Sequence, residues 1–466
     1  MSIPGGMEAV AMNESKILDR FIQSRPLCVM TRCILGHLLT EELDDVFAQC
    51  RQRQYEADIK FSALALSVAD IALNFCENFN QAYKKHKEEL AASVVAYYGK
   101  LNRVEASVSE GVVHFAGHKA SELNRALGGQ PHEVVPGYKC SVLDGNHLPK
   151  SDKRLGALRG LSAAALPGTV VAKFNLEEQL FERAYLLEDA HAQECMVLDR
   201  VVAELQANEL LIADRHFCIA KFLLDVAAAN GFFVIRQHGR LHGELLGERR
   251  QVGRSDTGMV YEQALRIRDS SGRDLTVRRI TVELGTPTRD GDEAIHLLAN
   301  VPGAQAGAVQ LAQLYRDRWD IENAFYVLTM TLTCEMKSMG HPRAALFLFC
   351  MAMLAYNCRQ VLYTALCTAH SAAEVEEMSQ YSVALEIAQP MDGLVTAIPE
   401  CDWDRLVPAN VSGRAAFLSR VAGDVNLAAH RKSRRGPKKP RPPRQRFKAC
   451  MHVSTYRVLE NQKQRC

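Results

Sequence analysis

The stretch KCSVLDGNHL, residues 139–148, decides the fold class because the pattern of the chain changes there. A short apolar run ends at Asp144-Gly145, which predicts a strand followed by a turn. The residues before it have the spacing of helices, and those after it alternate between strand-like and helix-like segments. We therefore expect an α/β fold whose mixed domain begins near residue 136.

Upstream of this stretch, the chain has a helical pattern. Apolar residues recur at intervals of three and four, as in Phe61, Leu64 and Val68, without sustained alternation. The basic residues among them are interspersed with acidic ones, so a solvated helix surface explains them as well as contact with DNA does. We expect residues 1–135 to form a helical N-terminal region.

Downstream, the predicted order is strand, strand, strand, helix, strand, helix, strand across residues 136–236. After the first strand, the expected strands are 169–174, 183–187, 209–213 and 232–236, and the expected helices are 194–205 and 217–229.

Residues 237–304 change character again, because 259–267, 274–284 and 294–300 alternate or are rich in β-branched residues. This predicts a β-rich insertion. The mixed domain then resumes over residues 305–370, followed by a helical C-terminal region at 371–430 and a tail at 431–466. The expected helices here are 308–332, 342–369 and 411–429.

The composition is that of a soluble protein with several domains. The chain has 466 residues, 47% hydrophobic and 24% charged. Residues 1–13 lack the pattern of a secretory signal, and the longest strongly apolar run, 344–356, is shorter than the roughly 20 residues that span a bilayer. The fourteen cysteines include no CxxC pair, which argues against structural zinc. We expect a cytoplasmic protein with no membrane contact.

Positive charge is concentrated in the tail. Residues 431–448 contain ten Lys and Arg and no acidic residue, whereas the whole chain has a net charge of only +2. Four prolines exclude a helix there, so we expect an extended segment that binds the DNA backbone without reading its sequence. The candidate phosphate contacts are Arg431, Lys432, Arg434, Arg435, Lys438 and Lys439.

Three carboxylates are candidates for a metal-dependent reaction at a phosphodiester. Asp144 and Asp214 each end a predicted strand, and Glu322 lies on a helix after the insertion. Two divalent ions about 4 Å apart can activate the attacking oxygen and stabilise the leaving oxygen, and hard cations prefer such oxygen ligands. Taken alone, either aspartate is more often a turn residue or a helix cap.

A third pattern strengthens the hypothesis. Tyr315, Arg318 and Glu322 are spaced by three and four, so they share one helix face. An arginine and a phenol beside a metal-binding carboxylate suit a groove that holds DNA phosphate. The residues alone leave a structural alternative open, an Arg318–Glu322 salt bridge within the helix with Tyr315 packed in the core.

The chain resembles the DDE transposases of the insertion-sequence-four family, which includes the transposases of transposons Tn-five and Tn-ten. The resemblance is carried by VLDGNHL at 142–148, LLIADRHF at 210–217 and LYRDRWDIENAF at 314–325. It implies an RNase H-like catalytic core with a β-rich insertion. It assigns the family's catalytic and metal-binding triad to Asp144, Asp214 and Glu322, with two Mg²⁺ ions that Mn²⁺ can replace. It also maps the family's Tyr/Arg/Glu pattern onto Tyr315, Arg318 and Glu322.

The resemblance further implies a transposase of a bacterial mobile element. Such a protein binds the terminal inverted repeats of its insertion sequence, acts as a dimer on DNA and moves the element by cut-and-paste cleavage and strand transfer. Recognition of the ends would fall to the N-terminal helices, and the protein would be associated with the nucleoid. One departure is Thr329, where the family pattern has a lysine. A metal-dependent nuclease that does not join strands, and an inactive DNA-binding descendant, stay open as alternatives.

Overall fold

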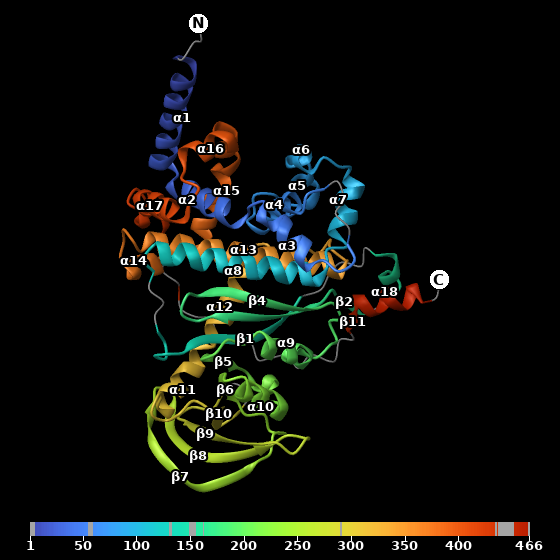
Figure 1. Ribbon diagram of the computed structural model, residues 1–466, viewed down its shortest axis with the longest axis vertical. Coiled ribbons are helices and arrows are strands. Elements are labelled where there is room, and N and C mark those ends of the chain that lie inside the picture. Colours follow the sequence, from blue (N-terminus) through green and yellow to red (C-terminus); the bar gives the residue numbers. More distant parts are fainter. Residues whose placement is uncertain are drawn as a thin grey trace.

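The computed structural model describes residues 5–54, 59–129, 133–148, 155–161, 163–288, 291–433, 436 and 452–464. A nine-stranded sheet runs through the molecule, and two long helices cross one face of its first strands. These helices are α8, Ala106–Ala126, and α13, Pro342–Leu366. Further N-terminal and C-terminal helices pack beyond them (Figure 1).

The N-terminal region is helical, as the apolar spacing predicts. Local signals explain several helix starts: Pro26 occupies the first turn of α2, and the side chains of Asn78 and Ser93 accept backbone N–H groups at the starts of α5 and α7. The helices before α8 are α1 Gly5–Ser24, α2 Pro26–Leu38, α3 Glu42–Cys50, α4 Phe61–Ala72, α5 Phe79–Lys85, α6 Lys87–Leu90 and α7 Val94–Leu101.

The first five strands of the sheet lie in the order β4-β3-β1-β5-β6. β1 is antiparallel to β3 and parallel to β5, and β5 is parallel to β6. The predicted alternation of strands and helices is confirmed. The bounds are β1 Lys139–His147, β3 Thr169–Asn175, β4 Leu180–Leu187, η2 Glu194–Val197, α9 Leu198–Ala203, β5 Glu209–Ala213, η3 Arg215–Phe217, α10 Ala220–Ala228 and β6 Phe232–Arg236.

The turn predicted at Asp144-Gly145 is wrong. β1 continues to His147, because Gly145 pairs with Val171 of β3 and the ladder persists to the end of the strand. On its other side, β1 stops pairing with β5 at Leu143. Asp144 therefore lies inside a strand, but just beyond the last β5 pair.

The insertion extends the same sheet. β10 pairs with β6, and the order continues as β10-β9-β8-β7. Three of its strands are close to the predicted ranges, whereas β7 was not predicted. Most of its side chains are exposed, so its sequence, ELLGERRQVGRS, carries little apolar alternation. The bounds are β7 Glu244–Ser255, β8 Gly258–Arg268, β9 Asp274–Leu284 and β10 Ala294–Ala299.

Residues 308–332 form two helices rather than the single one expected. α11, Ala308–Asp317, and α12, Trp319–Met330, meet at Arg318. The long helix α13 then passes through the core. By length and composition alone α13 could cross a membrane, but 89% of its apolar window is buried inside the protein, as in the core helix of a globular fold.

The C-terminal helices return to the N-terminal region, since α15 and α17 both contact α2. The helix predicted over 411–429 ends early, at Ala422, and a short 3-10 turn, Leu427–His430, follows. β11 pairs with β2 near the end of the chain. The remaining bounds are η1 Gly156–Leu158, β2 Ala164–Leu166, α14 Ala372–Glu376, α15 Gln380–Ala397, α16 Glu400–Leu406, α17 Val411–Ala422, β11 His452–Ser454 and α18 Thr455–Lys463.

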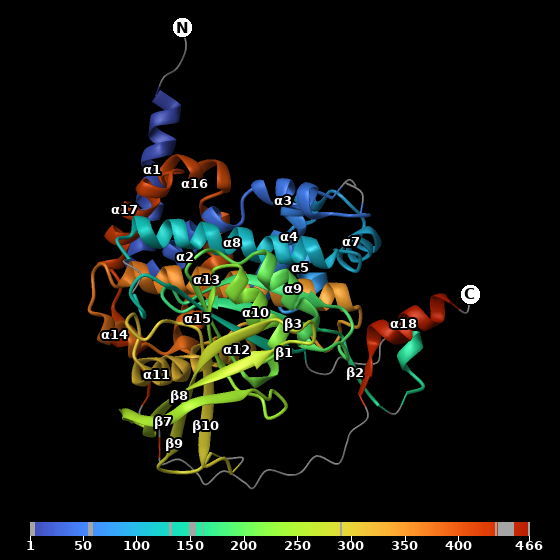
Figure 2. The ribbon, with the colours of Figure 1, turned by 60° about the horizontal axis from the view of Figure 1, so that its bottom comes forward.

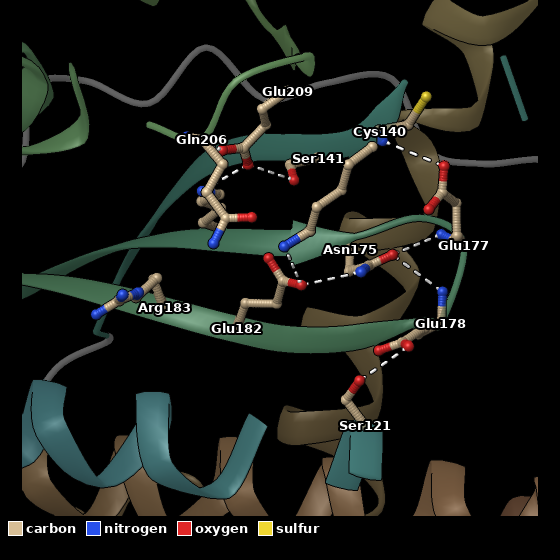
Figure 3. Close-up of polar contacts among 12 residues, drawn as sticks. Ser121, Cys140, Ser141, Asn175, Glu177, Glu178, Glu182, Arg183, Gln206 and Glu209 are labelled. Carbon is tan, nitrogen blue, oxygen red and sulfur yellow. Dashed lines mark hydrogen bonds and ion pairs between the residues drawn. The ribbon is translucent and has the colours of Figure 1, made fainter. Parts of the chain in front are cut away.

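A buried polar network ties the strands together where β1 and β5 begin (Figure 3). The carboxylate of Glu209 accepts a hydrogen bond from Ser141 Oγ at 2.8 Å and pairs with Lys173 Nζ at 2.5 Å. All three side chains are buried. A buried charge needs this kind of partner, so the network fixes how β3, β1 and β5 align. The same alignment fixes the position of Asp144 on β1, three residues after Ser141.

Candidate active site

Asp144 lies on β1 where β5 no longer pairs with it. Its side chain is 18% exposed, and its Oδ1 accepts the backbone N–H of Gly145 at 3.0 Å. Burial raises the pKa of Asp144 to about 6, against the lowering effects of Arg318 and of the Gly145 N–H, and with a further increase from the negative charges of Glu322 and Glu194. Negative charge is therefore concentrated around this carboxylate.

Asp214 follows the last residue of β5. Its Oδ1 accepts a hydrogen bond from the hydroxyl of Tyr315 on α11, at 3.2 Å. Burial and the charge of Asp214 raise the pKa of Tyr315, so the phenol stays protonated and donates. The tyrosine of the predicted motif thus contacts the second candidate carboxylate.

Arg318 connects the other two carboxylates. Its Nη1 donates to Oδ2 of Asp144 at 2.9 Å, and its Nη2 donates to Oε1 of Glu322 at 2.7 Å. The Arg318 side chain is only 10% exposed, whereas Glu322 is 36% exposed. Its buried Nε has no hydrogen-bond partner among the described residues. The intrahelical Arg318–Glu322 bridge is present, but Tyr315 does more than fill the core, since it bonds Asp214.

The donor chemistry of these residues suits a hard divalent cation. The three carboxylates come from β1, from the residue after β5 and from α12, and they offer the oxygen ligands that such a cation prefers. Within the described ranges, however, no group of three or more His, Cys, Asp or Glu residues stands close enough to hold a metal ion. Arg318 bonds two of the three carboxylates, so metal binding requires these side chains to rearrange.

Glu194 is a site residue that the sequence-based hypothesis missed. It opens the 3-10 turn before α9, and its side chain is 18% exposed. Its carboxylate fills the space where a Cβ would stand on Gly145, and its Oε2 lies 3.9 Å from Nδ1 of His216. The signal was the glycine directly after Asp144, which was interpreted as a turn residue and is instead a point of close approach.

Of the basic segment 431–448, the structure describes only residues 431–433 and 436. Arg431 forms a β-bridge with Met378 and an ion pair with Glu377 at 3.3 Å. The backbone N–H of Lys432 donates to the carbonyl of Glu377, and its Nζ donates to the carbonyl of Glu376. Both side chains are thus engaged within the protein. The other predicted phosphate contacts, Arg434, Arg435, Lys438 and Lys439, lie outside the described residues.

Comparison with known proteins is consistent with this geometry. The family model of the transposase DDE domain matches residues 169–358. That segment contains Asp214, Tyr315, Arg318 and Glu322, and it begins after Asp144. The chain therefore contains a segment similar to the DDE domain of transposases.

A solved structure is also similar at a low level. It is the piggyBac transposase synaptic complex with hairpin DNA, with 7% sequence identity and a TM-score of 0.41, covering 84% of this chain and 85% of that one. Both values are too low to support an inference. No curated protein sequence matches the chain.

Proposed function

We propose that this protein is a DNA transposase that cleaves DNA at the ends of its own element and joins those ends to a target. The observation that carries the proposal is a pair of contacts from one motif: Tyr315 bonds Asp214, and Arg318 bonds both Asp144 and Glu322. Four of these five residues lie inside the segment similar to a transposase DDE domain. A structural salt bridge alone would not require a tyrosine on the second aspartate.

The strand order supports an RNase H-like core as the catalytic fold. Three antiparallel neighbours, β4, β3 and β1, continue into the parallel strands β5 and β6. Two candidate carboxylates lie side by side on β1 and after β5, and the third comes from α12 after the β-rich insertion. Together with the motifs at 142–148, 210–217 and 314–325, this arrangement supports our proposal that the chain belongs to the insertion-sequence-four group of DDE transposases.

Asp144, Asp214 and Glu322 would hold two Mg²⁺ ions, which Mn²⁺ can replace, and the ions would supply activation of the attacking oxygen and stabilisation of the leaving oxygen. Two neighbouring side chains would position a carboxylate and bind the DNA. Tyr315 holds Asp214 in place through its hydroxyl. The buried Nε of Arg318 has no hydrogen-bond partner among the described residues, and such a donor is suited to a DNA phosphate oxygen.

The proposed function also implies how the rest of the protein would bind DNA. The N-terminal helices would recognise the terminal inverted repeats, a dimer would hold two ends together, and the basic tail would add affinity for the DNA backbone. The protein would act at the nucleoid. A hairpin intermediate is not part of the proposal.

The test is strand cleavage with purified protein and labelled duplex carrying the inverted repeats that flank the gene, in Mg²⁺ or Mn²⁺. Asp144→Asn, Asp214→Asn and Glu322→Gln should each abolish cleavage while leaving binding to the ends largely intact. Thr329→Ala is the matched control and should still cleave, because Thr329 lies on α12 with Glu322 and its hydroxyl donates to the backbone carbonyls of Phe325 and Tyr326. If all three acidic variants keep the fold but lose DNA binding, the metal assignment is wrong.

A further inference from the structure

A second polar surface lies on the insertion strands, on the side away from α11. α11 contacts β7, β8 and β9, and Ile280 and Val282 belong to the core on its side. Strand geometry places the residues between and beside them on the opposite face. In Figure 2, β7, β8 and β9 come forward with α11 beside them.

The strand register aligns polar side chains on that opposite face. Thr281 of β9 pairs with Tyr261 of β8 and with His296 of β10, so these three residues form a row across the sheet. The Thr281 hydroxyl is 3.0 Å from Nδ1 of His296. Arg279 lies two residues before Thr281 and therefore on the same face.

Arg279 differs from Arg249 on this surface because its hydrogen-bond partner is an amide oxygen and not a carboxylate. It is half-buried, and its Nε donates to Oε1 of Gln237 at 2.8 Å. Among the described residues no carboxylate is paired with it, and burial together with the nearby charge of Arg249 lowers its pKa. A half-buried guanidinium that faces another cation, and that has only an amide oxygen as partner, has donors to spare for an anion.

The surroundings of Arg279 are also positive. Burial, followed by the charges of Arg279, Arg249 and Arg236, lowers the pKa of His296 to about 4. Arg249 stacks 3.7 Å over the ring of Tyr261, which holds its guanidinium on this face, and is paired with Glu283 at 2.5 Å. One carboxylate on Arg249 leaves the surface with an excess of positive charge.

We propose that Arg279, with Arg249 and the neutral His296 beside it, binds a phosphodiester group of the DNA backbone. This inference rests on the proposed function. The β5–β6 register ends with Ala213 opposite Ile235, so Gln237, the partner of Arg279, lies just beyond the end of β6. Tyr315 of α11 bonds Asp214, so the carboxylates lie on the α11 side of the sheet, and the Arg279 surface would contact DNA on the other face.

The alternative is that Arg279 only holds Gln237 in place. The two roles differ in their response to salt, because each phosphate contact that is lost lowers the slope of log affinity against log salt by about 0.9. The experiment measures binding of a fluorescently labelled duplex of arbitrary sequence across a salt series. It compares the full-length protein with Arg279→Gln, Arg279→Lys and Arg249→Gln. Arg268→Gln, in an exposed pair with Asp274 at the far end of β8, is the matched control.

Arg279→Gln and Arg249→Gln should each weaken binding several-fold and reduce the slope by about one, while Arg279→Lys and Arg268→Gln keep the wild-type slope. An unchanged slope in a folded Arg279→Gln, or an equal reduction in Arg279→Lys or Arg268→Gln, would overturn the inference. Cleavage of end-containing DNA by the wild-type protein is measured in parallel. Its absence alongside the predicted slopes would refute the proposed function and leave the phosphate site standing.

Discussion

Arg318 donates a hydrogen bond across 2.9 Å to the carboxylate of Asp144, which joins the helix pair α11–α12 to strand β1 of the sheet. Its second donor group bonds Glu322 in the same way. One guanidinium therefore neutralises part of two carboxylates that we assign to metal binding. Arg318 therefore affects both the stability of the metal-free protein and the DNA cleavage that we assign to these carboxylates.

Replacing Arg318 with Gln should separate these two effects. Asp144 and Glu322 would face each other without their counter-charge, so we expect the metal-free protein to lose roughly 1–3 kcal/mol of stability. Because a divalent ion would then supply the missing charge, Mg²⁺ should raise the melting temperature of Arg318→Gln more than that of the wild type. Calorimetry with and without Mg²⁺ measures both, and an equal Mg²⁺ response in the two proteins would contradict the assignment. DNA cleavage should fall at least about a hundredfold.

Gly145→Ala tests the close approach of Glu194. A Cβ at this position would meet the Glu194 carboxylate, so either the strand or the carboxylate must move. Because that carboxylate is the far end of a flexible side chain, we expect it to move at a cost of up to about 1 kcal/mol, with a loss of cleavage. Because the clash needs both groups, Gly145→Ala combined with Glu194→Ala should recover most of the stability, giving a measurable coupling free energy in a double-mutant cycle. Additive losses would show that the two residues do not meet.

The buried pair of Lys173 and Glu209 should behave as a unit. Glu209→Gln leaves the Lys173 ammonium buried without its counter-charge, so we expect a loss of about 3–5 kcal/mol. Combining Lys173→Met with Glu209→Gln removes both charges and should restore much of that loss. Denaturant unfolding measures these differences, and a single variant as stable as the wild type would mean that the pair is not buried in solution.

Glu335 predicts a pH-dependent stability. Burial raises the pKa of Glu335 to about 8, and its buried Oε1 has no partner among the described residues. The protonated form is favoured in the folded state, so stability is fully present below the ordinary pKa of a glutamate and is lost as the pH rises through about 8. Glu335→Gln should therefore be more stable than the wild type at pH 8, by roughly 2–4 kcal/mol, and nearly equal to it at pH 4.5. Melting temperatures at the two pH values check this, and equal differences at both would contradict it.

The elements with strong local patterns were predictable from the sequence. The buried runs at β5 and β6 depend on neighbours in the chain. The four-residue spacing of Arg318 and Glu322 likewise allows the ion pair that these two side chains form. Features that depend on distant partners were not predictable. The extension of β1 past Asp144 is set by the β3 ladder.

The same distinction explains the remaining differences. β7 has few buried side chains and is held by its pairing with β8, so its own sequence lacks the apolar alternation of a half-buried strand. Glu194 lies fifty residues from Asp144 in the sequence, and only the fold brings them together. The break between α11 and α12 places Arg318 between two carboxylates, a position that a continuous helix does not predict.

The most direct test of the central claim is a strand-transfer assay with purified protein, labelled DNA carrying the flanking inverted repeats, a target plasmid and Mg²⁺ or Mn²⁺. We predict labelled ends joined to the plasmid by the wild type and no joined product from Glu322→Gln, which should still bind the ends. Cleavage without joining would show a nuclease instead, and end binding with neither reaction would show an inactive DNA-binding protein; either result would contradict the account.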